Sequence, residues 1–166
     1  MLFRIAGVVN DSIVDGPGVR LAIFFQGCNY KCPGCHNVNT WDVNAGHLED
    51  TNTITKMIKE NPLLDGITLT GGEALLQKEA VLELSKIAKA HNLDVTLYTG
   101  STLEELLSRN DEVINEILHL IDYLIDGPFV LSLKDTTLPY RGSSNQRLID
   151  VKKSLKENKV ILFEPF

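Results

Sequence analysis

The sequence contains little cysteine, few aromatic residues and no long hydrophobic run. Its 166 residues include three cysteines, one tryptophan and two methionines. No window approaches the roughly 20 apolar residues that a membrane-spanning helix requires. An odd and small number of cysteines suits a reducing compartment and metal binding better than a disulfide framework. We therefore expect a soluble protein that folds without disulfides.

Basic residues are also in the minority. The chain has 16 lysines and arginines against 22 acidic residues, and its net charge is -6. Without a basic stripe, this balance argues against a nucleic-acid partner. The first residues, Met1 to Val9, lack the apolar region and cleavage site of an export signal, so we expect a cytoplasmic protein with no membrane partner. The length fits a single domain, residues 1–166, that buries roughly 70% of its unfolded surface.

Segments typical of strands alternate with segments typical of helices. Apolar runs predict strands at 19–26, 66–70, 94–99, 123–126 and 160–163. Helical periodicity predicts a helix capped by Thr51 or Asn52 and ending near Asn61, a helix over 78–91, and a stretch from Thr102 to about His119 with a break at 110–111. We expect a loop from Gly27 to about Asp50. The alternation predicts an α/β fold with a mostly parallel sheet. At this length the fold is a partial (β/α) barrel or an open sheet, because a full barrel needs roughly 250 residues.

Distinctive residues follow three of the expected strands. They are the loop that holds the cysteines, the segment Thr70 to Glu73, and the segment Tyr98 to Gly100. The carboxyl ends of parallel strands meet at one edge of a sheet, which is where α/β proteins bind ligands. We therefore expect these three segments to converge on one site.

The cysteines Cys28, Cys32 and Cys35 lie within eight residues of one another. Three thiolates are one too few to saturate a 4Fe-4S cluster, so such a cluster would keep one iron open to another ligand. The pattern Cys-x-x-Cys-His also matches c-type haem attachment and, in part, a redox dithiol. Haem attachment suits an exported protein, and a dithiol leaves Cys28 unexplained. A structural zinc site with His36 or His47 as fourth ligand remains open from the spacing alone.

The rest of the chain resembles the radical S-adenosylmethionine superfamily, whose signature is Cys-x3-Cys-x2-Cys after the first strand. Within it, the sequence is similar to the activating proteins of anaerobic ribonucleotide reductase from about residue 10 to 147. The matching segments are Asp15-Gly-Pro-Gly18 with Arg20, Gly27-Cys28, Cys32-Pro-Gly-Cys-His-Asn37, Thr40-Trp41, Leu69-Thr-Gly-Gly-Glu73, Leu97-Tyr-Thr-Gly100, Asp126-Gly-Pro-Phe129, Leu133-Lys-Asp135 and Arg141-Gly-Ser-Ser-Asn-Gln-Arg147.

This resemblance implies a specific radical chemistry. A 4Fe-4S cluster would reductively cleave S-adenosylmethionine, and the resulting radical would take a hydrogen atom from a glycine of the reductase. The implied partners are the large catalytic subunit of the anaerobic ribonucleotide reductase, an electron donor such as flavodoxin or ferredoxin, and a second copy of the chain in a homodimer. The alternatives are an activase for another glycyl radical enzyme, such as pyruvate formate-lyase, and a noncatalytic zinc-binding or electron-transfer domain.

The resemblance also implies roles for particular residues. Cys28, Cys32 and Cys35 would bind the cluster. The residues expected to contact S-adenosylmethionine are Gly34, Cys35, His36, Gly71, Gly72, Glu73 and Thr99. A plain strand-to-helix turn explains Gly71 and Gly72 equally well. Arg20 is the least supported candidate and the one offered for a catalytic role, while Arg141–Arg147 is expected to fix a loop or to contact a ligand or partner.

Overall fold

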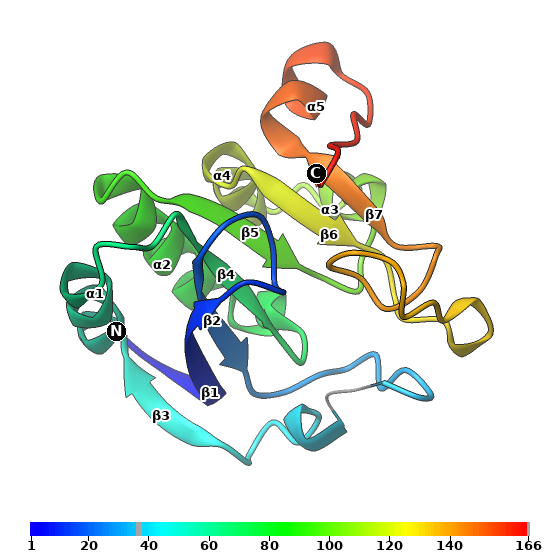
Figure 1. The fold of residues 1–166 in the computed structure, drawn as a ribbon. Coiled ribbons are helices and arrows are strands. Elements are labelled where there is room, and N and C mark those ends of the chain that lie inside the picture. Colours follow the sequence, from blue (N-terminus) through cyan, green and yellow to red (C-terminus); the bar gives the residue numbers. More distant parts are fainter. Residues whose placement is uncertain (36–37, 166) are drawn as a thin grey trace.

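A computed structural model describes residues 1–35 and 38–165. In this part of the chain seven strands form one sheet in the order β3-β1-β2-β4-β5-β6-β7 (Figure 1). The strands are β1 (Leu2–Ser12), β2 (Arg20–Phe25), β3 (His47–Asp50), β4 (Gly66–Gly71), β5 (Asp94–Tyr98), β6 (Tyr123–Asp126) and β7 (Arg147–Asp150). The α-helices are α1 (Thr51–Glu60), α2 (Lys78–Ala90), α3 (Leu103–Ser108), α4 (Glu112–Leu120) and α5 (Val151–Glu157), and short 3-10 helices are η1 (Val38–Thr40), η2 (Ala74–Gln77) and η3 (Leu131–Leu133).

The sheet is parallel in its centre and antiparallel at both edges. The central strands β2, β4, β5 and β6 are the four apolar runs expected from the sequence, and they pair in parallel. Strand β1 pairs antiparallel with β2 and β3, and β7 pairs antiparallel with β6. The antiparallel strands β1 and β3 were not expected, because they expose much of their length and carry no continuous apolar run.

The prediction of a fifth strand over 160–163 was wrong. This segment forms only an isolated bridge between Leu162 and Ile149. It still covers the outer edge of β7, because Phe163 N donates to Leu148 O at 3.0 Å and Asp150 N donates to Ile161 O at 2.8 Å. The strand at this edge of the sheet is β7, and α5 follows it. The sequence patterns predicted neither element.

Helix termini follow the capping residues, with one correction. Asp50, rather than Thr51 or Asn52, caps α1, and its carboxylate accepts from Asn52 N at 2.9 Å. Thr102 caps α3 as expected. Asp111 caps α4 and marks the expected break between the two helices. Charged or hydroxyl side chains therefore satisfy amide groups that α1, α3 and α4 leave unpaired at their starts, whereas α2 begins without a side-chain cap.

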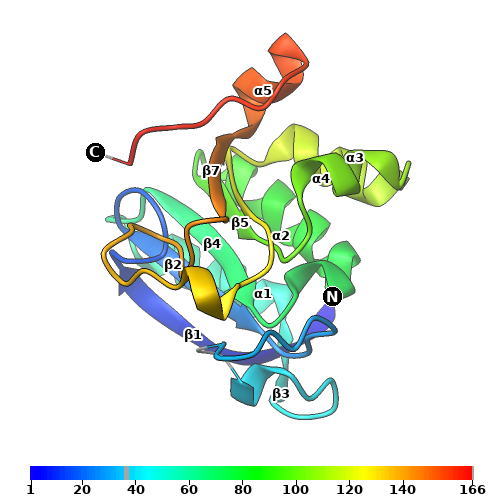
Figure 2. The same cartoon turned by 90° about the vertical axis from the view of Figure 1, so that its right-hand side faces the viewer.

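Helices α1 to α4 cover one face of the sheet, while the β1–β2 loop and residues 127–146 lie over the other (Figure 2). The helix side holds the apolar core, where Leu84 of α2 and Ile117 of α4 are completely buried. Packed helices fill one face, and a cavity opens on the loop-covered face. The sheet and its two covering segments thus position the cavity described below.

Helix length also sets a limit on membrane insertion. The longest helix, α2, has 13 residues, which corresponds to about 20 Å. The hydrocarbon core of a bilayer is about 30 Å thick. Over residues 1–35 and 38–165, no helix is long and apolar enough to cross a membrane.

Candidate functional site

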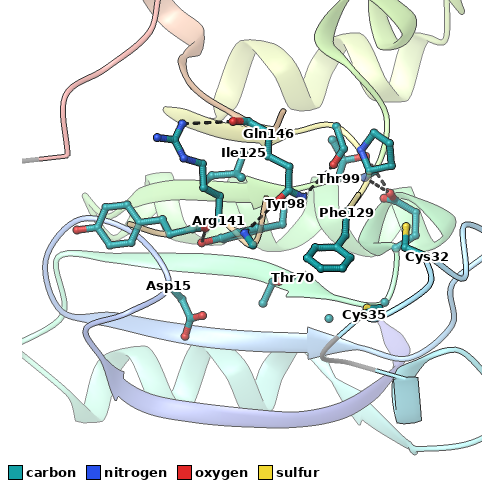
Figure 3. Close-up of a pocket in the computed structure, with 18 of the residues that line it drawn as sticks. Asp15, Cys32, Cys35, Thr70, Tyr98, Thr99, Ile125, Phe129, Arg141 and Gln146 are labelled. Carbon is teal, nitrogen blue, oxygen red and sulfur yellow. Dashed lines mark hydrogen bonds between the residues drawn. The ribbon is translucent and has the colours of Figure 1, made fainter. Parts of the chain in front are cut away.

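The carboxyl ends of the parallel strands open into a cavity of about 670 Å³ (Figure 3). This volume falls within the roughly 300–1,000 Å³ of small-molecule sites. Each of the three segments expected to converge contributes to its wall. The contributions are Cys28, Cys32 and Cys35 after β2, Thr70 to Glu73 after β4, and Tyr98 to Gly100 after β5.

The three cysteines are half-buried at one end of this cavity. The backbone of β2 leads directly into the first of them, and Cys28 N donates to Trp41 O at 3.1 Å. A turn brings the other two together, because Cys35 N donates to Cys32 O at 3.1 Å. All three remain thiols in the described part of the chain.

The surroundings of Cys32 oppose its ionisation. Burial raises the pKa of the Cys32 thiol, and the negative charge that Cys35 and Cys28 acquire on ionisation raises it further. The backbone N–H of Phe129 donates to the Cys32 sulfur and acts in the opposite direction. Metal binding requires thiolates, so a group of positive iron atoms would relieve the repulsion among the three sulfurs. Hydrogen bonds to ligating sulfurs also tune the potential of an iron-sulfur cluster.

The donor set fits a cluster in its chemistry, because thiolates are the usual ligands of 4Fe-4S clusters. Within the described ranges, no three His, Cys, Asp or Glu side chains gather closely enough to coordinate one ion together. A cubane does not require such convergence, because each thiolate binds a different iron.

Gly71 and Gly72 join the end of β4 to the start of the cysteine loop. A Cβ on Gly71 would lie 2.3 Å from Phe25 N, and one on Gly72 would lie 2.2 Å from Gly27 O. Glu73 N donates to Gly27 O at 2.7 Å in the same place. Close approach of two backbones therefore requires both glycines, and this approach leaves their own backbone atoms on the cavity wall.

Glu73 lies beneath the cavity, with its carboxylate directed into the protein. It is 4% exposed. Its Oε1 accepts from Thr99 Oγ1 at 2.9 Å and from Gly100 N at 2.7 Å, while Oε2 accepts from Leu75 N at 3.0 Å. Burial raises the pKa of Glu73 although these three donors favour the charged form. Glu73 and Thr99 thus connect the loops after β4 and β5.

Arg20 lies at the opposite end of the sheet from the cavity. It is the first residue of β2 and pairs with Gly66, whereas Phe25 pairs with Gly71 beside the cavity. Five residues of strand separate the two ends by about 16 Å. The side chain is fully buried and does not line the cavity. The structure therefore does not bring the proposed catalytic candidate to the site.

Two further residues, Gly34 and His36, were expected to contact S-adenosylmethionine. Gly34 lies at the surface next to residue 131, and a Cβ there would be 2.6 Å from Leu131 Cδ1. Gly34 is not among the residues that line the cavity. His36 lies outside the described residues.

Residues 127–146 form a roof over the cavity, and hydrogen bonds from Gln146 hold this roof together. Gln146 Oε1 accepts from Gly142 N at 2.9 Å and from Ser143 N at 3.2 Å, and its Nε2 donates to Gly127 O at 3.1 Å. Arg141 NH1 donates to Gln146 O at 3.3 Å, the contact drawn in Figure 3. The expectation that Arg141–Arg147 fixes a loop thus agrees with these contacts.

The sequence reasoning did not single out several residues of the wall. Ile13 and Val14 of the β1–β2 loop and Tyr140 of the roof line the cavity. Tyr98 OH donates to Tyr140 O at 2.5 Å and so attaches the roof to β5. Tyr30, between the first two cysteines, also lines the wall. Periodicity could not identify these residues, because they lie in loops whose course depends on the tertiary structure.

The chain matches the family model of a 4Fe-4S single cluster domain over residues 14–149. This match and the three thiols in the cavity define an iron-sulfur protein with a single 4Fe-4S domain. In structure, the chain is similar to QueE from Escherichia coli, with a TM-score of 0.53 and 14% identity over 76% of this chain and 70% of that one. At that identity the similarity concerns the fold alone.

Sequence comparison identifies a particular family within the iron-sulfur proteins. The chain is 37% identical to the anaerobic ribonucleoside-triphosphate reductase-activating proteins of Salmonella typhi and Escherichia coli K12, over 81% of this chain and 90% of each relative. It therefore belongs to the family of anaerobic ribonucleoside-triphosphate reductase-activating proteins. It is also 35% identical to the pyruvate formate-lyase-activating enzyme of Clostridium pasteurianum, over 72% of this chain and 54% of that enzyme.

Proposed function

We propose that this protein is a radical S-adenosylmethionine activase that generates a glycyl radical on the anaerobic ribonucleotide reductase. The observation that carries the proposal is the meeting of three thiols with the Gly71–Gly72 backbone at one cavity. The family relationship supports the same function. We also assign the whole chain, residues 1–166, to one radical S-adenosylmethionine domain with a partial (β/α) barrel; the parallel centre of the sheet agrees with such a fold.

The cysteines would hold one 4Fe-4S cluster per chain. When bound, this cluster supplies the electron for reductive cleavage of S-adenosylmethionine at its open iron. The protein contributes binding, orientation and exclusion of water, as in other cofactor enzymes. Gly71 and Gly72 would present backbone groups to the ligand, and the roof would exclude water from it.

Buried Glu73 would act indirectly, by holding Thr99 and Gly100 at the cavity wall. We assign it a positioning role rather than direct contact with the ligand, because its two oxygens already accept three hydrogen bonds. Thr99 would remain the polar group nearest the ligand in this part of the wall.

The electron would come from outside the chain. The three cysteines are the whole cysteine content, so one cluster uses every thiol and leaves none for a second redox centre. We therefore propose a small one-electron carrier of the cytoplasm, such as a flavodoxin or ferredoxin, as the donor.

A first experiment tests the cofactor. We expect anaerobic reconstitution to give about four irons and four sulfides per chain, as a cubane requires. Replacement of any one cysteine, as in Cys32→Ala, should abolish stable incorporation, whereas Ser108→Ala on the exposed end of α3 should not. One tetrahedral zinc per chain and no cleavage of S-adenosylmethionine would contradict the proposal.

A second experiment tests the macromolecular substrate. The reconstituted protein, S-adenosylmethionine and a reductant are mixed with the large subunit of the anaerobic ribonucleotide reductase, and the glycyl radical is measured by paramagnetic resonance. A parallel mixture contains pyruvate formate-lyase, because the similarity to its activating enzyme favours that second candidate. A signal with the lyase and none with the reductase would reassign the substrate.

A further inference from the structure

Backbone hydrogen bonds attach the cysteine loop to residues further along the chain. Its start is fixed by the bonds from Gly27 N to Thr40 O at 2.6 Å and from Cys28 N to Trp41 O at 3.1 Å. Further along, Lys31 is exposed and adopts a positive φ of 48°. Between the first two cysteines, an isolated loop of this kind would sample many conformations.

Tyr30 attaches this part of the loop to the turn between β5 and α3. Its hydroxyl is hydrogen-bonded to Ser101 Oγ. Ser101 is 1% exposed and also accepts from Arg109 NH2 at 2.7 Å. Its backbone N donates to Thr99 Oγ1 at 3.2 Å. The tyrosine therefore binds a fixed, buried hydroxyl rather than a surface group.

The ring of Tyr30 also has a defined packing site. It lies over Gly100, where a Cβ would be 2.8 Å from two of its ring atoms. Gly100 N in turn donates to Glu73 Oε1 at 2.7 Å. The absence of a side chain at Gly100 makes room for the ring, and buried Glu73 holds the backbone beneath it.

We propose that Tyr30 is a positioning residue for the iron-sulfur cluster. Seated on Gly100 and Ser101, it holds the segment between Cys28 and Cys32 in place before the metal arrives. This inference rests on the proposed function in one respect, namely that the cysteines bind a cluster. A cluster has a fixed shape, so ligands that are already ordered bind it with less loss of conformational entropy.

The test compares Tyr30→Phe, Ser101→Ala and the double variant with the wild type. Tyr30→Phe keeps the ring and removes only the hydroxyl. Tyr123→Phe is the matched control, because that ring packs on Phe163 away from the cavity. Gly100→Ala is a second probe, since its methyl group would displace the ring from its seat.

The first measurement is hydrogen exchange of residues 28–35 in the metal-free protein. We expect exchange about fivefold faster in Tyr30→Phe and Ser101→Ala, the factor that one net hydrogen bond represents. The double variant should be no faster than Ser101→Ala, because that change already removes the bond to Tyr30 together with the bond from Arg109. Faster exchange is also expected in Gly100→Ala. Unchanged exchange in all of them would overturn the proposal even if no cluster forms in any protein.

The second measurement is the rate at which an iron chelator removes iron from the reconstituted protein under anaerobic conditions. Loss should be several-fold faster in Tyr30→Phe than in Tyr123→Phe, with an unchanged melting temperature of the metal-free form. Equal loss rates in these two variants would overturn the positioning role. Failure of the wild type to bind iron would instead contradict the proposed function, leaving the exchange result to decide the role of Tyr30 in ordering the loop.

Discussion

At the scale of single residues, Glu73 combines burial with charge. An ionised carboxylate in the interior is costly unless donors surround it. Three donors do so here, yet burial still raises the pKa of Glu73 above its ordinary value. Glu73 therefore joins two loops of the cavity wall, and its contribution to the free energy of unfolding depends on pH.

The contribution of Glu73 to the free energy of unfolding falls as pH rises. Because the pKa of Glu73 is higher in the folded protein than in the unfolded chain, the folded state binds the proton more tightly. Its contribution to stability is full below the unfolded value, falls as pH rises towards the folded pKa, and stays at the lower level above it. Glu73→Gln removes this titration.

We expect the free energy of unfolding of the metal-free wild type, relative to Glu73→Gln, to decrease as pH rises above about 4.5, the ordinary carboxyl value. Urea unfolding at a series of pH values measures it. Glu83→Gln, in the middle of α2, is the control. A difference that is constant with pH would show that the carboxyl titrates alike in both states.

At the scale of elements, the roof of residues 127–146 depends on side-chain to backbone hydrogen bonds. It contains only the short helix η3 and one isolated bridge, from Lys134 to Ser143. In place of a ladder of hydrogen bonds between strands, the Gln146 side chain makes hydrogen bonds to the backbone of Gly127, Gly142 and Ser143. Removing that side chain should loosen the roof as a unit.

Gln146→Ala should weaken the binding of S-adenosylmethionine to the reconstituted protein by about tenfold, roughly the value of one to two net hydrogen bonds. Equilibrium dialysis under anaerobic conditions measures the affinity. Gln77→Ala is a matched control, because Gln77 also makes three bonds to backbone, with Arg4 and Gln26, but outside the cavity. An equal loss of affinity in both variants would refute a specific role for the roof.

At the scale of the whole molecule, Arg20 connects the amino ends of three parallel strands. Its guanidinium donates to Thr68 Oγ1 at 2.7 Å, to Ile67 O at 2.8 Å and to Asp94 in β5. It also donates to Pro17 O at 2.6 Å in the β1–β2 loop. These bonds satisfy a fully buried cation and explain the residue without a catalytic role.

Arg20→Ala should lower the free energy of unfolding by about 3–5 kcal/mol, because it removes a fully buried guanidinium, leaves its buried acceptors unpaired and deprives half-buried Asp94 of its partner. Thermal and urea unfolding measure the loss. Iron content after reconstitution, assayed well below the melting temperature, should remain that of the wild type. Arg4→Ala, on the partly exposed strand β1, should cost less than about 1 kcal/mol. A stable Arg20→Ala protein that fails to generate the glycyl radical would restore the catalytic hypothesis.

The central strands and the cysteines could be predicted from the sequence because their signals are local. Apolar residues recur within the short segments of β2, β4, β5 and β6, and the three thiols lie within eight residues of one another. The edge strands could not be predicted in this way. Only two of the four residues in β7 are buried, and its pairing depends on where β6 lies.

The sequence by itself determined the parallel centre of the sheet, the cap at Thr102, the break at 110–111 and the spacing of the thiols. Each of these depends on residues close together in the chain. Only the tertiary structure decided what surrounds the thiols, since Tyr30 meets Ser101 across 71 residues and Glu73 meets Thr99 across 26. It also separated Arg20 from the cavity. The physical reason is that strand pairing sets which end of the sheet a residue occupies, and local periodicity carries no information about partners so far away.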